Sequence, residues 1–525
     1  MQLPFFSDNP VGGAGMRRGE RSMQDKPVTS VVIAGGGTAG WMAAATLSRN
    51  FGPDALKVTL VESAEIGTVG VGEATIPPIL QLNAQLGIDE DDLLRRTQGT
   101  YKLGIEFVDW GRQGSRYFHP FGSYGADLGG VAFHHHWLRT REGALADYSL
   151  NTGAALAGKF DRPTEDPRSV LSKLSYALHF DATLYAALLR ERSLEQGVEA
   201  VEGRIARVVL DQLSGHVDRL DLADGRTLRA DLYIDCTGFR GLLIEQALNT
   251  GYEDWSHWLP MDRALAVPTA PAGPPLPYTR STADAAGWRW RIPLQHRVGN
   301  GHVYSSAFTD EAAATEALVA GLDGQMLAAP RALSFTTGRR RKMWNRNVVA
   351  LGLAGGFVEP LESTSIHLIQ RGVVTLMSLF PAGGFVQAEI DCYNRLMQAE
   401  MEEVRDFVIL HYKQSLRDDT PFWRAVQAMS VPDSLAERMA IFAHCGRLLL
   451  GPGELFREPS WVAVMLGQGL VPQGYDPLAN GIPESDLRPA LQRMRAVIGR
   501  GVEALPSHAA FLRERSSAEP GERAG

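Results

Sequence analysis

The stretch TSVVIAGGGTAGW, residues 29–41, joins an apolar run to three consecutive glycines and a fourth glycine at Gly40. The apolar run predicts a buried strand, and the glycines open a helix that continues to about Asn50. A second strand is predicted at 57–62, which completes a strand, turn, helix and strand in succession. In G-x-G-x-x-G the first glycine permits the tight turn, the second lets the backbone approach a pyrophosphate, and the third allows close packing of the helix.

This pattern predicts a dinucleotide site at the start of the helix, where free N–H groups favour phosphate. An acidic residue closing the second strand is expected to bind the ribose hydroxyls. The predicted contacts are Gly35, Gly37, Thr38, Ala39, Gly40 and Glu62. For the glycines alone, the alternative is an ordinary turn between a strand and a helix.

Two later segments favour FAD over NAD as the dinucleotide. Residues 230–238 and 347–356 are apolar runs that end in glycine, and both resemble the later FAD-contacting strands of flavoprotein monooxygenases. Leu353 in the second run is predicted to contact FAD. The sequence holds one complete glycine fingerprint, so we expect no tight NADPH site.

The composition is that of an ordinary globular protein. Of 525 residues, 44% are hydrophobic and 21% charged, and the formal net charge is -8. This charge argues against nucleic-acid binding, because no basic stripe is available to neutralise phosphates. Cys236, Cys392 and Cys445 form no C-x-x-C pair, which excludes a disulfide framework and suits a reducing cytoplasm. No stretch has the 18 or more apolar residues that a membrane span needs.

Further along the chain, residues 101–110 alternate between apolar and polar and predict a half-buried strand. A Gly- and Pro-rich loop is expected at 269–279, and helical periodicity continues from 363 to 512. The predicted fold class is therefore α/β, with a Rossmann-like FAD-binding body of the flavoprotein monooxygenase type and a mainly helical C-terminal part. The predicted divisions are a disordered tail at 1–26, an FAD-binding and catalytic domain at 27–370, a helical substrate-side domain at 371–512 and a second tail at 513–525.

Three segments resemble the flavin-dependent tryptophan halogenase family, and the resemblance covers most of the chain. They are GWRWRIP at 287–293, EPLESTSI at 359–366 and GTYKL at 99–103. The first matches the W-x-W-x-I-P signature, whose tryptophans, here Trp288 and Trp290, lie near the flavin and disfavour ordinary monooxygenation in that family. The alternative is two aromatic side chains on one face of a strand.

The resemblance also implies site residues. Glu362 takes the place of the active-site carboxylate, and the backbone around Thr364 and Ser365 that of the halide site, at a predicted helix start that favours an anion. Tryptophan halogenases have glycine where this chain has Ser365, and serine is compatible with a first helical turn. Lys102 takes the place of the essential lysine. Without the resemblance, a lysine on the polar phase of a strand is usually solvated, and Thr364 is an ordinary N-cap.

Residues 70–77 resemble the family's flexible strap over the flavin, with Gly72, Glu73, Ala74 and Thr75 as predicted cofactor contacts. His119 and Phe121 match residues that line the substrate pocket. The run at 134–136 is three histidines, but on an extended segment their side chains would alternate between faces, so we expect no metal site.

The implied activity is halogenation of an electron-rich, indole-type ring. Reduced FAD from a separate NAD(P)H-dependent flavin reductase, oxygen, and bromide or chloride give hypohalous acid, which Lys102 activates by a hydrogen bond or as a haloamine. Glu362 then stabilises the cationic ring or takes its proton. The alternatives are an aromatic hydroxylase and a catalytically silent flavoprotein, and a homodimer is left open as the assembly.

The segment Leu450–Gly467 departs from the family. Tryptophan-specific members hold the amino-acid ammonium and carboxylate with paired tyrosines and a glutamate, and this segment has no tyrosine. Glu454 and Phe456 stand in only in part, and Pro452 with Gly453 predicts a turn. We therefore expect an open pocket that accepts free indole or a larger indole- or phenol-like compound at least as well as tryptophan.

Overall fold

The computed structural model describes residues 26–63 and 72–516, so the predicted tails lie outside it apart from Lys26 and residues 513–516. Gly70 and Val71 of the predicted strap also lie outside the described residues. The dinucleotide unit forms as expected, with β1 at Ser30–Ala34, α1 at Thr38–Phe51 and β2 at Lys57–Glu62. β1 and β2 run parallel, and buried apolar side chains line both strands.

These strands belong to a six-stranded sheet in the order β20-β21-β12-β1-β2-β8. The strands that join β1 and β2 are parallel to them, except that β20 is antiparallel to β21. The added members are β8 (Glu199–Glu202), β12 (Leu232–Asp235), β20 (Trp344–Asn345) and β21 (Val348–Ala350). A near-continuous apolar run is typical of parallel strands covered on both faces. β12 and β21 lie in the two segments predicted to approach FAD.

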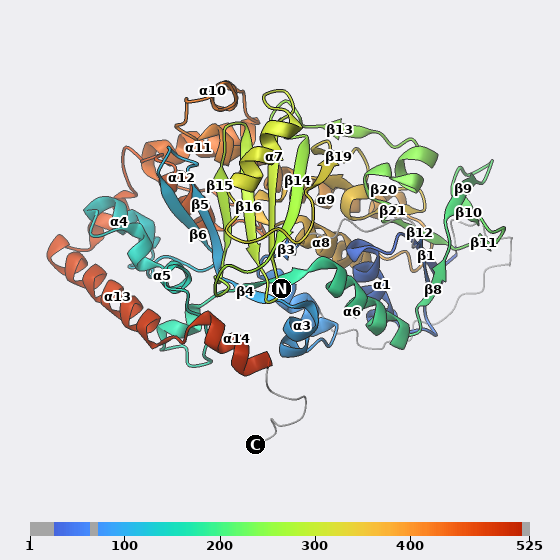
Figure 1. Cartoon of the computed structure of the whole chain (residues 1–525), viewed down its shortest axis with the longest axis horizontal. Helices are drawn as coiled ribbons and strands as arrows, with labels where there is room; N and C mark the ends of the chain where they lie inside the picture. The colour runs from blue at the N-terminus through green and yellow to red at the C-terminus, as the bar shows by residue number, and fades with distance from the viewer. Residues whose placement is uncertain (1–25, 64–71, 517–525) are drawn as a thin grey trace, which may run out of the picture.

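A second, seven-stranded sheet stands beside this body in the centre of Figure 1, in the order β18-β14-β17-β16-β15-β5-β6. Its neighbours are antiparallel except β15 and β5. The members are β5 (Gly104–Val108), β6 (Arg116–Pro120), β14 (Arg263–Thr269), β15 (Thr279–Ala283), β16 (Gly287–Pro293), β17 (Val298–Tyr304) and β18 (Arg331–Ser334). The predicted loop joins β14 to β15.

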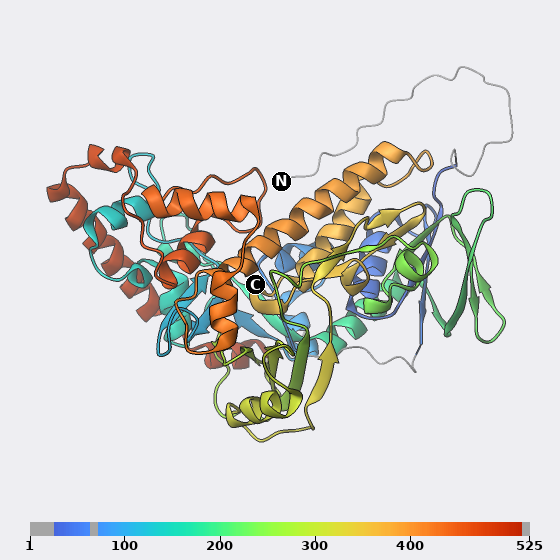
Figure 2. The same cartoon turned by 90° about the horizontal axis from the view of Figure 1, so that it is seen from above.

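Helices pack around the two sheets. Seen from above in Figure 2, the long α9 lies between the six-stranded body and the helices that gather at the opposite end of the molecule. Residues 78–320 contribute α2 (Pro78–Gln85), α3 (Glu90–Thr97), α4 (Phe133–Thr140), α5 (Leu150–Leu156), α6 (Ala182–Glu195) and α7 (Glu311–Ala320). Residues 365–516 contribute α8 (Ser365–Ser378), α9 (Gln387–Lys413), α10 (Pro421–Ala428), α11 (Asp433–Cys445), α12 (Glu458–Gly467), α13 (Glu484–Ala504) and α14 (His508–Ser516).

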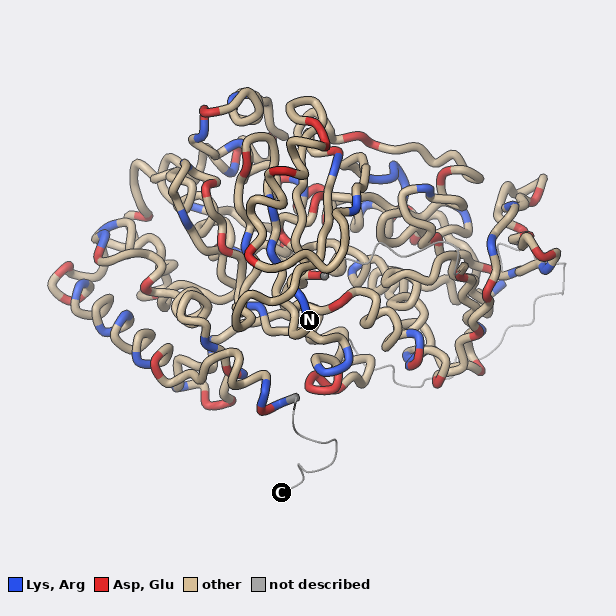
Figure 3. Tube along the Cα trace, in the orientation of Figure 1, with Lys and Arg blue, Asp and Glu red and all other residues tan. Residues whose placement is uncertain are grey.

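The predicted helical C-terminal part is therefore present. The proposed boundary after residue 370 falls inside α8, and α14 continues to Ser516, past the predicted start of the tail at 513. Over the described residues in Figure 3, acidic and basic residues are interspersed along the trace. None of the helices in residues 26–63 and 72–516 is long and apolar enough to span a membrane.

Two local predictions are wrong. The alternating segment at 101–110 splits into β4 (Thr100–Lys102) and β5, and both strands are buried throughout. The alternation failed as a sign of exposure because Lys102 is hydrogen-bonded to Thr75 and Ser363, and the buried Glu106 pairs with Arg116 and Arg280. The histidine run at 134–136 lies in α4 and not on an extended segment. All three histidines are buried in this helix.

The last helix of the described residues, α14, forms a hydrogen bond with β4. This strand pairs with β7 (Ala177–Asp181), which also pairs with β3 (Gly72–Ala74). On the other edge of β4, the Tyr101 N–H donates to Nε2 of His508 at 3.2 Å. Tyr101 also stacks on Phe160, with ring centroids 3.9 Å apart. α14 thereby holds the strand that carries Lys102.

Candidate active site

Lys102 ends β4 with its side chain wholly buried. Its Nζ donates to the Thr75 carbonyl at 3.0 Å and to Ser363 Oγ at 2.8 Å, and it lies 5.1 Å from the centre of the Phe121 ring. Burial lowers the pKa of Lys102 to about 7, although the nearby carboxylate of Glu362 opposes this. A lysine with such a pKa exchanges its proton near neutral pH, which suits acid–base or nucleophilic work.

Glu362 lies next to Ser363 and is held between two histidines. Its Oε2 is 2.9 Å from Nδ1 of His119, on β6, and its Oε1 is 2.8 Å from Nε2 of His411, on α9. Burial raises the pKa of Glu362, but the charge and hydrogen bonds of His119 and His411 outweigh burial, so the pKa falls to about 2. Glu362 is therefore a carboxylate at neutral pH, although it is almost wholly buried.

The segment after Glu362 turns into a helix. Ser363 has a left-handed backbone with φ of 61°, a conformation that costs a non-glycine residue energy and is concentrated at functional sites. Thr364 is the N-cap of α8, but no side chain caps the helix, and the buried Thr364 hydroxyl has no hydrogen-bond partner among the described residues. Ser365 is the first helical residue and needs no left-handed backbone. The site predicted for halide thus offers uncapped N–H groups and a free hydroxyl.

The W-x-W pair lies on β16, and its two side chains share one face of the sheet. The buried Trp288 donates its indole N–H to Oε1 of Glu359 at 3.2 Å, and Tyr412 donates its hydroxyl to the same oxygen. Burial raises the pKa of Glu359 to about 7, and the hydrogen bonds from Tyr412 and Trp288 oppose this only in part. A carboxyl that fixes the orientation of Trp288 was missed in the sequence.

The residues predicted for FAD fit a dinucleotide. A Cβ on Gly35 would lie 2.4 Å from the Cys236 carbonyl oxygen, and one on Gly40 would lie 1.9 Å from the Gly35 carbonyl oxygen, so both positions require glycine. α1 begins at Thr38 without a side-chain cap or an acidic residue in its first turn. Its N–H groups are therefore open to a phosphate. The backbone of Leu353 belongs to a 3-10 turn, Gly352–Ala354, and a Cβ on Gly352 would lie 2.9 Å from Ala39 Cβ.

Two predicted FAD contacts have other partners in the structure. Glu62 accepts from the Trp41 indole at 3.2 Å and pairs with Arg190 at 3.2 Å. The Thr75 hydroxyl bonds to Leu178 of β7 while its carbonyl accepts from Lys102. β3, which contains Gly72, Glu73 and Ala74, pairs with β7 and leads directly to Thr75.

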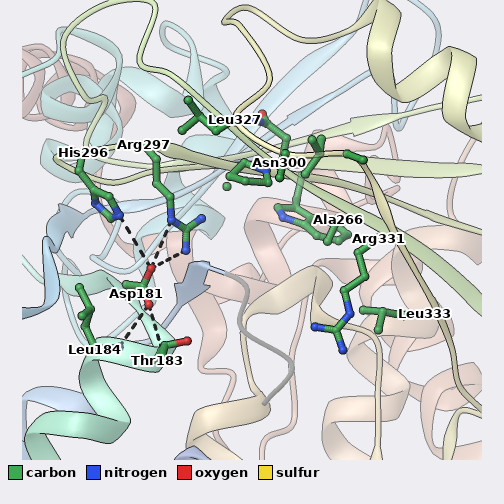
Figure 4. A pocket seen from close by; sticks show the side chains of 16 residues that line it. Asp181, Thr183, Leu184, Ala266, His296, Arg297, Asn300, Leu327, Arg331 and Leu333 are labelled. Carbon is green, nitrogen blue, oxygen red and sulfur yellow. Dashed lines mark hydrogen bonds and ion pairs between the residues drawn. The ribbon is translucent and has the colours of Figure 1, made fainter. Parts of the chain in front are cut away.

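A cavity of about 710 Å³ lies against the seven-stranded sheet, with Trp290 in its lining. Figure 4 shows Asp181 reaching from the start of α6 toward His296 and Arg297 at the rim. Asp181 accepts from Arg297 at 2.6 Å and caps the first N–H groups of α6. Because Asp181 ends β7 and is paired with Gly72 of β3, the cavity lies beside the predicted strap.

An aromatic wall stands beside His119. The Phe407 and Phe456 rings stack with centroids 3.8 Å apart, and the centre of His119 lies 5.6 Å from Phe407. The carboxylate of Glu454 is not free to bind a substrate beside these rings, because it forms an ion pair with Arg438 at 2.9 Å. The predicted turn is present, with φ of 83° at Gly453, and the segment ends in α12, which begins at Glu458.

The comparisons with known proteins agree with this geometry. The model of the tryptophan halogenase family matches residues 30–484. This chain belongs to the tryptophan halogenase family. A tryptophan 6-halogenase from Streptomyces toxytricini is 36% identical over 79% of this chain and 84% of its own. The structure of a flavin-dependent halogenase from Xanthomonas campestris is 48% identical, with a TM-score of 0.91 over 94% of this chain and 100% of that one. The structure of the flavin-dependent halogenase BrvH from Brevundimonas is 46% identical, with a TM-score of 0.90 over 93% of this chain and 99% of that one.

Membership confirms the fold class and the family predicted from the three motifs, and it makes the protein an FAD-dependent halogenase. Sequence reasoning predicted Lys102, Glu362 and His119, which lie close together in the structure, but missed His411 and Phe407. Both lie on α9 four residues apart and hence on one helix face. The available signal in the sequence was a histidine four residues after a phenylalanine in a predicted helix, which places both side chains on one face.

The histidine run has a structural role in this halogenase. His134 contacts Glu458 at 3.0 Å and the Gly446 carbonyl at 2.7 Å, which ties α4 to the C-terminal helices. Over the ranges that the structure describes, no group of three or more His, Cys, Asp or Glu side chains is arranged to hold a metal ion.

Proposed function

We propose that this halogenase acts on free indole or a larger indole- or phenol-like compound, and that it uses bromide at least as readily as chloride. Bromide is easier to oxidise and less strongly hydrated than chloride. The observation that carries the substrate proposal is the aromatic wall with Glu454 bound to Arg438. Because Arg438 engages Glu454, that carboxylate is not available to bind the ammonium group of an amino-acid substrate.

When bound, reduced FAD from a separate flavin reductase supplies hypohalous acid from oxygen and halide. The uncapped start of α8, at Thr364 and Ser365, is suited to hold the halide. The residues that would hold FAD are Gly35, Gly37, Thr38, Ala39, Gly40 and Leu353, with Glu62 and the strap residues Gly72, Glu73, Ala74 and Thr75 close by.

Lys102 is proposed to present the oxidised halogen to the ring. If its amine forms a haloamine, the nitrogen must be deprotonated, and turnover should rise with pH through about 7, the pKa of Lys102. If its ammonium donates a hydrogen bond to hypohalous acid, turnover should fall over the same range. Phe121 and His119 form the near side of the ring pocket, and Glu362 takes the proton that leaves the halogenated carbon.

The test compares indole and tryptophan as substrates in separate reactions. Purified protein, a flavin reductase, NADH, FAD and bromide are incubated with indole or with tryptophan, and brominated product is identified from its two-line isotope pattern. We expect kcat/KM for indole to equal or exceed that for tryptophan, and product yield with bromide to equal or exceed that with chloride. A tenfold preference for tryptophan would refute the substrate proposal.

A matched pair of variants tests the role of the lysine. Lys102→Ala should lose halogenation and keep FAD binding, whereas Lys57→Ala, at a side chain 70% exposed, should behave as wild type. Oxygen addition in place of bromine would favour an aromatic hydroxylase, and no product from any substrate would favour a silent flavoprotein.

A further inference from the structure

His411 lies at the centre of the buried site, although no family motif includes it. Its side chain is fully buried on α9 and touches the rings of Phe107, Trp110 and Phe407. Its two ring nitrogens face oxygen atoms. Nδ1 is 2.8 Å from the Phe407 carbonyl, and Nε2 is 2.8 Å from Oε1 of Glu362.

These two contacts fix the protons of the ring. A carbonyl oxygen only accepts, so Nδ1 of His411 carries a hydrogen. A neutral imidazole would then present a lone pair from Nε2 to a carboxylate oxygen at 2.8 Å, which is repulsive. Turning the ring over would replace both nitrogen contacts by carbon. The pair of His411 and Glu362 therefore holds one proton in addition to the one on Nδ1.

The surrounding charges place that proton on the histidine. The groups that act on the pair from the packed elements are His119 and Tyr117 on β6 and Lys102 on β4. The pKa of Glu362 at about 2 leaves the carboxylate ionised. The N–H of His411 is not aligned with Oε1, so the contact is an ion pair and not a well-directed hydrogen bond, which leaves this oxygen able to accept another proton.

We infer that His411 is a positioning residue that carries a positive charge at neutral pH and, together with His119, holds Glu362 ionised and apart from Lys102. The inference rests on the proposed function, in which Glu362 accepts the ring proton. The ring C–H bond breaks, its electron pair returns to the ring, and the proton passes to the Glu362 carboxylate. Without the two histidines, Glu362 would be drawn to Lys102 and hold that lysine in its ammonium form.

The protonation state is tested on the resting protein, without flavin or substrate. The chain has 13 histidines, so ¹⁵N-histidine spectra of wild type and His411→Gln are compared to assign the ring nitrogens. We expect both His411 nitrogens to show the imidazolium signature at pH 7.5. A neutral ring with hydrogen on Nδ1 alone would overturn the inference. Should His411→Gln fail to fold, His411→Asn serves for the assignment.

The role is tested by the pH profile of kcat. Glutamine at 411 carries no charge, so His411→Gln should lower kcat by about 10- to 100-fold, as for a lost contact with a charged group. Because the charge of His411 lowers the pKa of Glu362, the variant should also move the acid limb of the wild-type profile to higher pH. An equal loss of kcat with that limb unchanged would mean a merely structural role and would refute the inference. The spectra do not depend on turnover, so failure of indole halogenation would leave them informative.

Discussion

Burial of Lys102 makes a prediction about stability that needs no turnover. An ordinary lysine has a pKa of 10.5, and in the folded protein burial lowers the pKa of Lys102 to about 7. Between these values the unfolded chain holds a proton that the folded chain releases, so stability rises with pH over this range. Below pH 7 both states are protonated and the full cost of the buried ammonium applies. At 1.36 kcal/mol per pH unit, that cost is about 5 kcal/mol.

Lys102→Met removes this titration. Its absolute effect on stability combines relief of the buried charge with the loss of two hydrogen bonds, to Thr75 and Ser363, so the pH dependence is the decisive quantity. Between pH 7 and pH 9 we expect wild type to gain about 2 kcal/mol relative to Lys102→Met. Urea unfolding of flavin-free protein at the two pH values measures the difference. Lys57→Met, at an exposed position, is the control for removal of any lysine.

The result that would refute this reasoning is a difference between wild type and Lys102→Met that stays constant within about 0.5 kcal/mol from pH 7 to pH 9, a small fraction of what linkage demands. It would mean that Lys102 remains charged in the folded protein. The haloamine route would then lose its physical basis.

Three further predictions concern the halogenase reaction. Glu362→Gln should lower kcat by about 100-fold, as for loss of an acid–base group, and a rate within twofold of wild type would show that Glu362 is dispensable. Phe456→Ala should raise KM for indole about 3- to 10-fold, since an aromatic pair contributes about 0.5–1.5 kcal/mol, and an unchanged KM would place the ring elsewhere. With NADPH alone the protein should neither oxidise the nucleotide nor halogenate, and it should become active when chemically reduced FAD is added; direct NADPH oxidation would contradict the single fingerprint.

The parts of the fold that the sequence predicted have strong local signals. Gly35 and Gly40 are positions where no side chain fits, and such a requirement is visible in one chain without knowledge of its partners. The helical periodicity after residue 363 is equally local. Lys102 and Glu362 were predicted as site residues from their motifs alone, since the periodicity around Lys102 pointed to an exposed side chain.

What the sequence could not show depends on contacts between distant segments. Lys102 is buried because Thr75 and Ser363, which are 27 and 261 positions away, accept its hydrogen bonds. His411 contacts Glu362 because α9 passes beside the loop before α8. The ion pair between Glu454 and Arg438 is likewise a tertiary contact that the sequence does not show. It occupies a carboxylate that the sequence suggested as a partner for the substrate.

The hydrogen bond between Tyr101 and His508 has a practical consequence for anyone who handles this enzyme. Trimming the gene so that translation stops before His508 would delete less than a twentieth of the polypeptide, yet it would strip one edge of the strand that presents Lys102. An affinity tag appended beyond Ser516 leaves that fastening untouched. The position of Lys102 thus depends on α14, the last helix among the described residues.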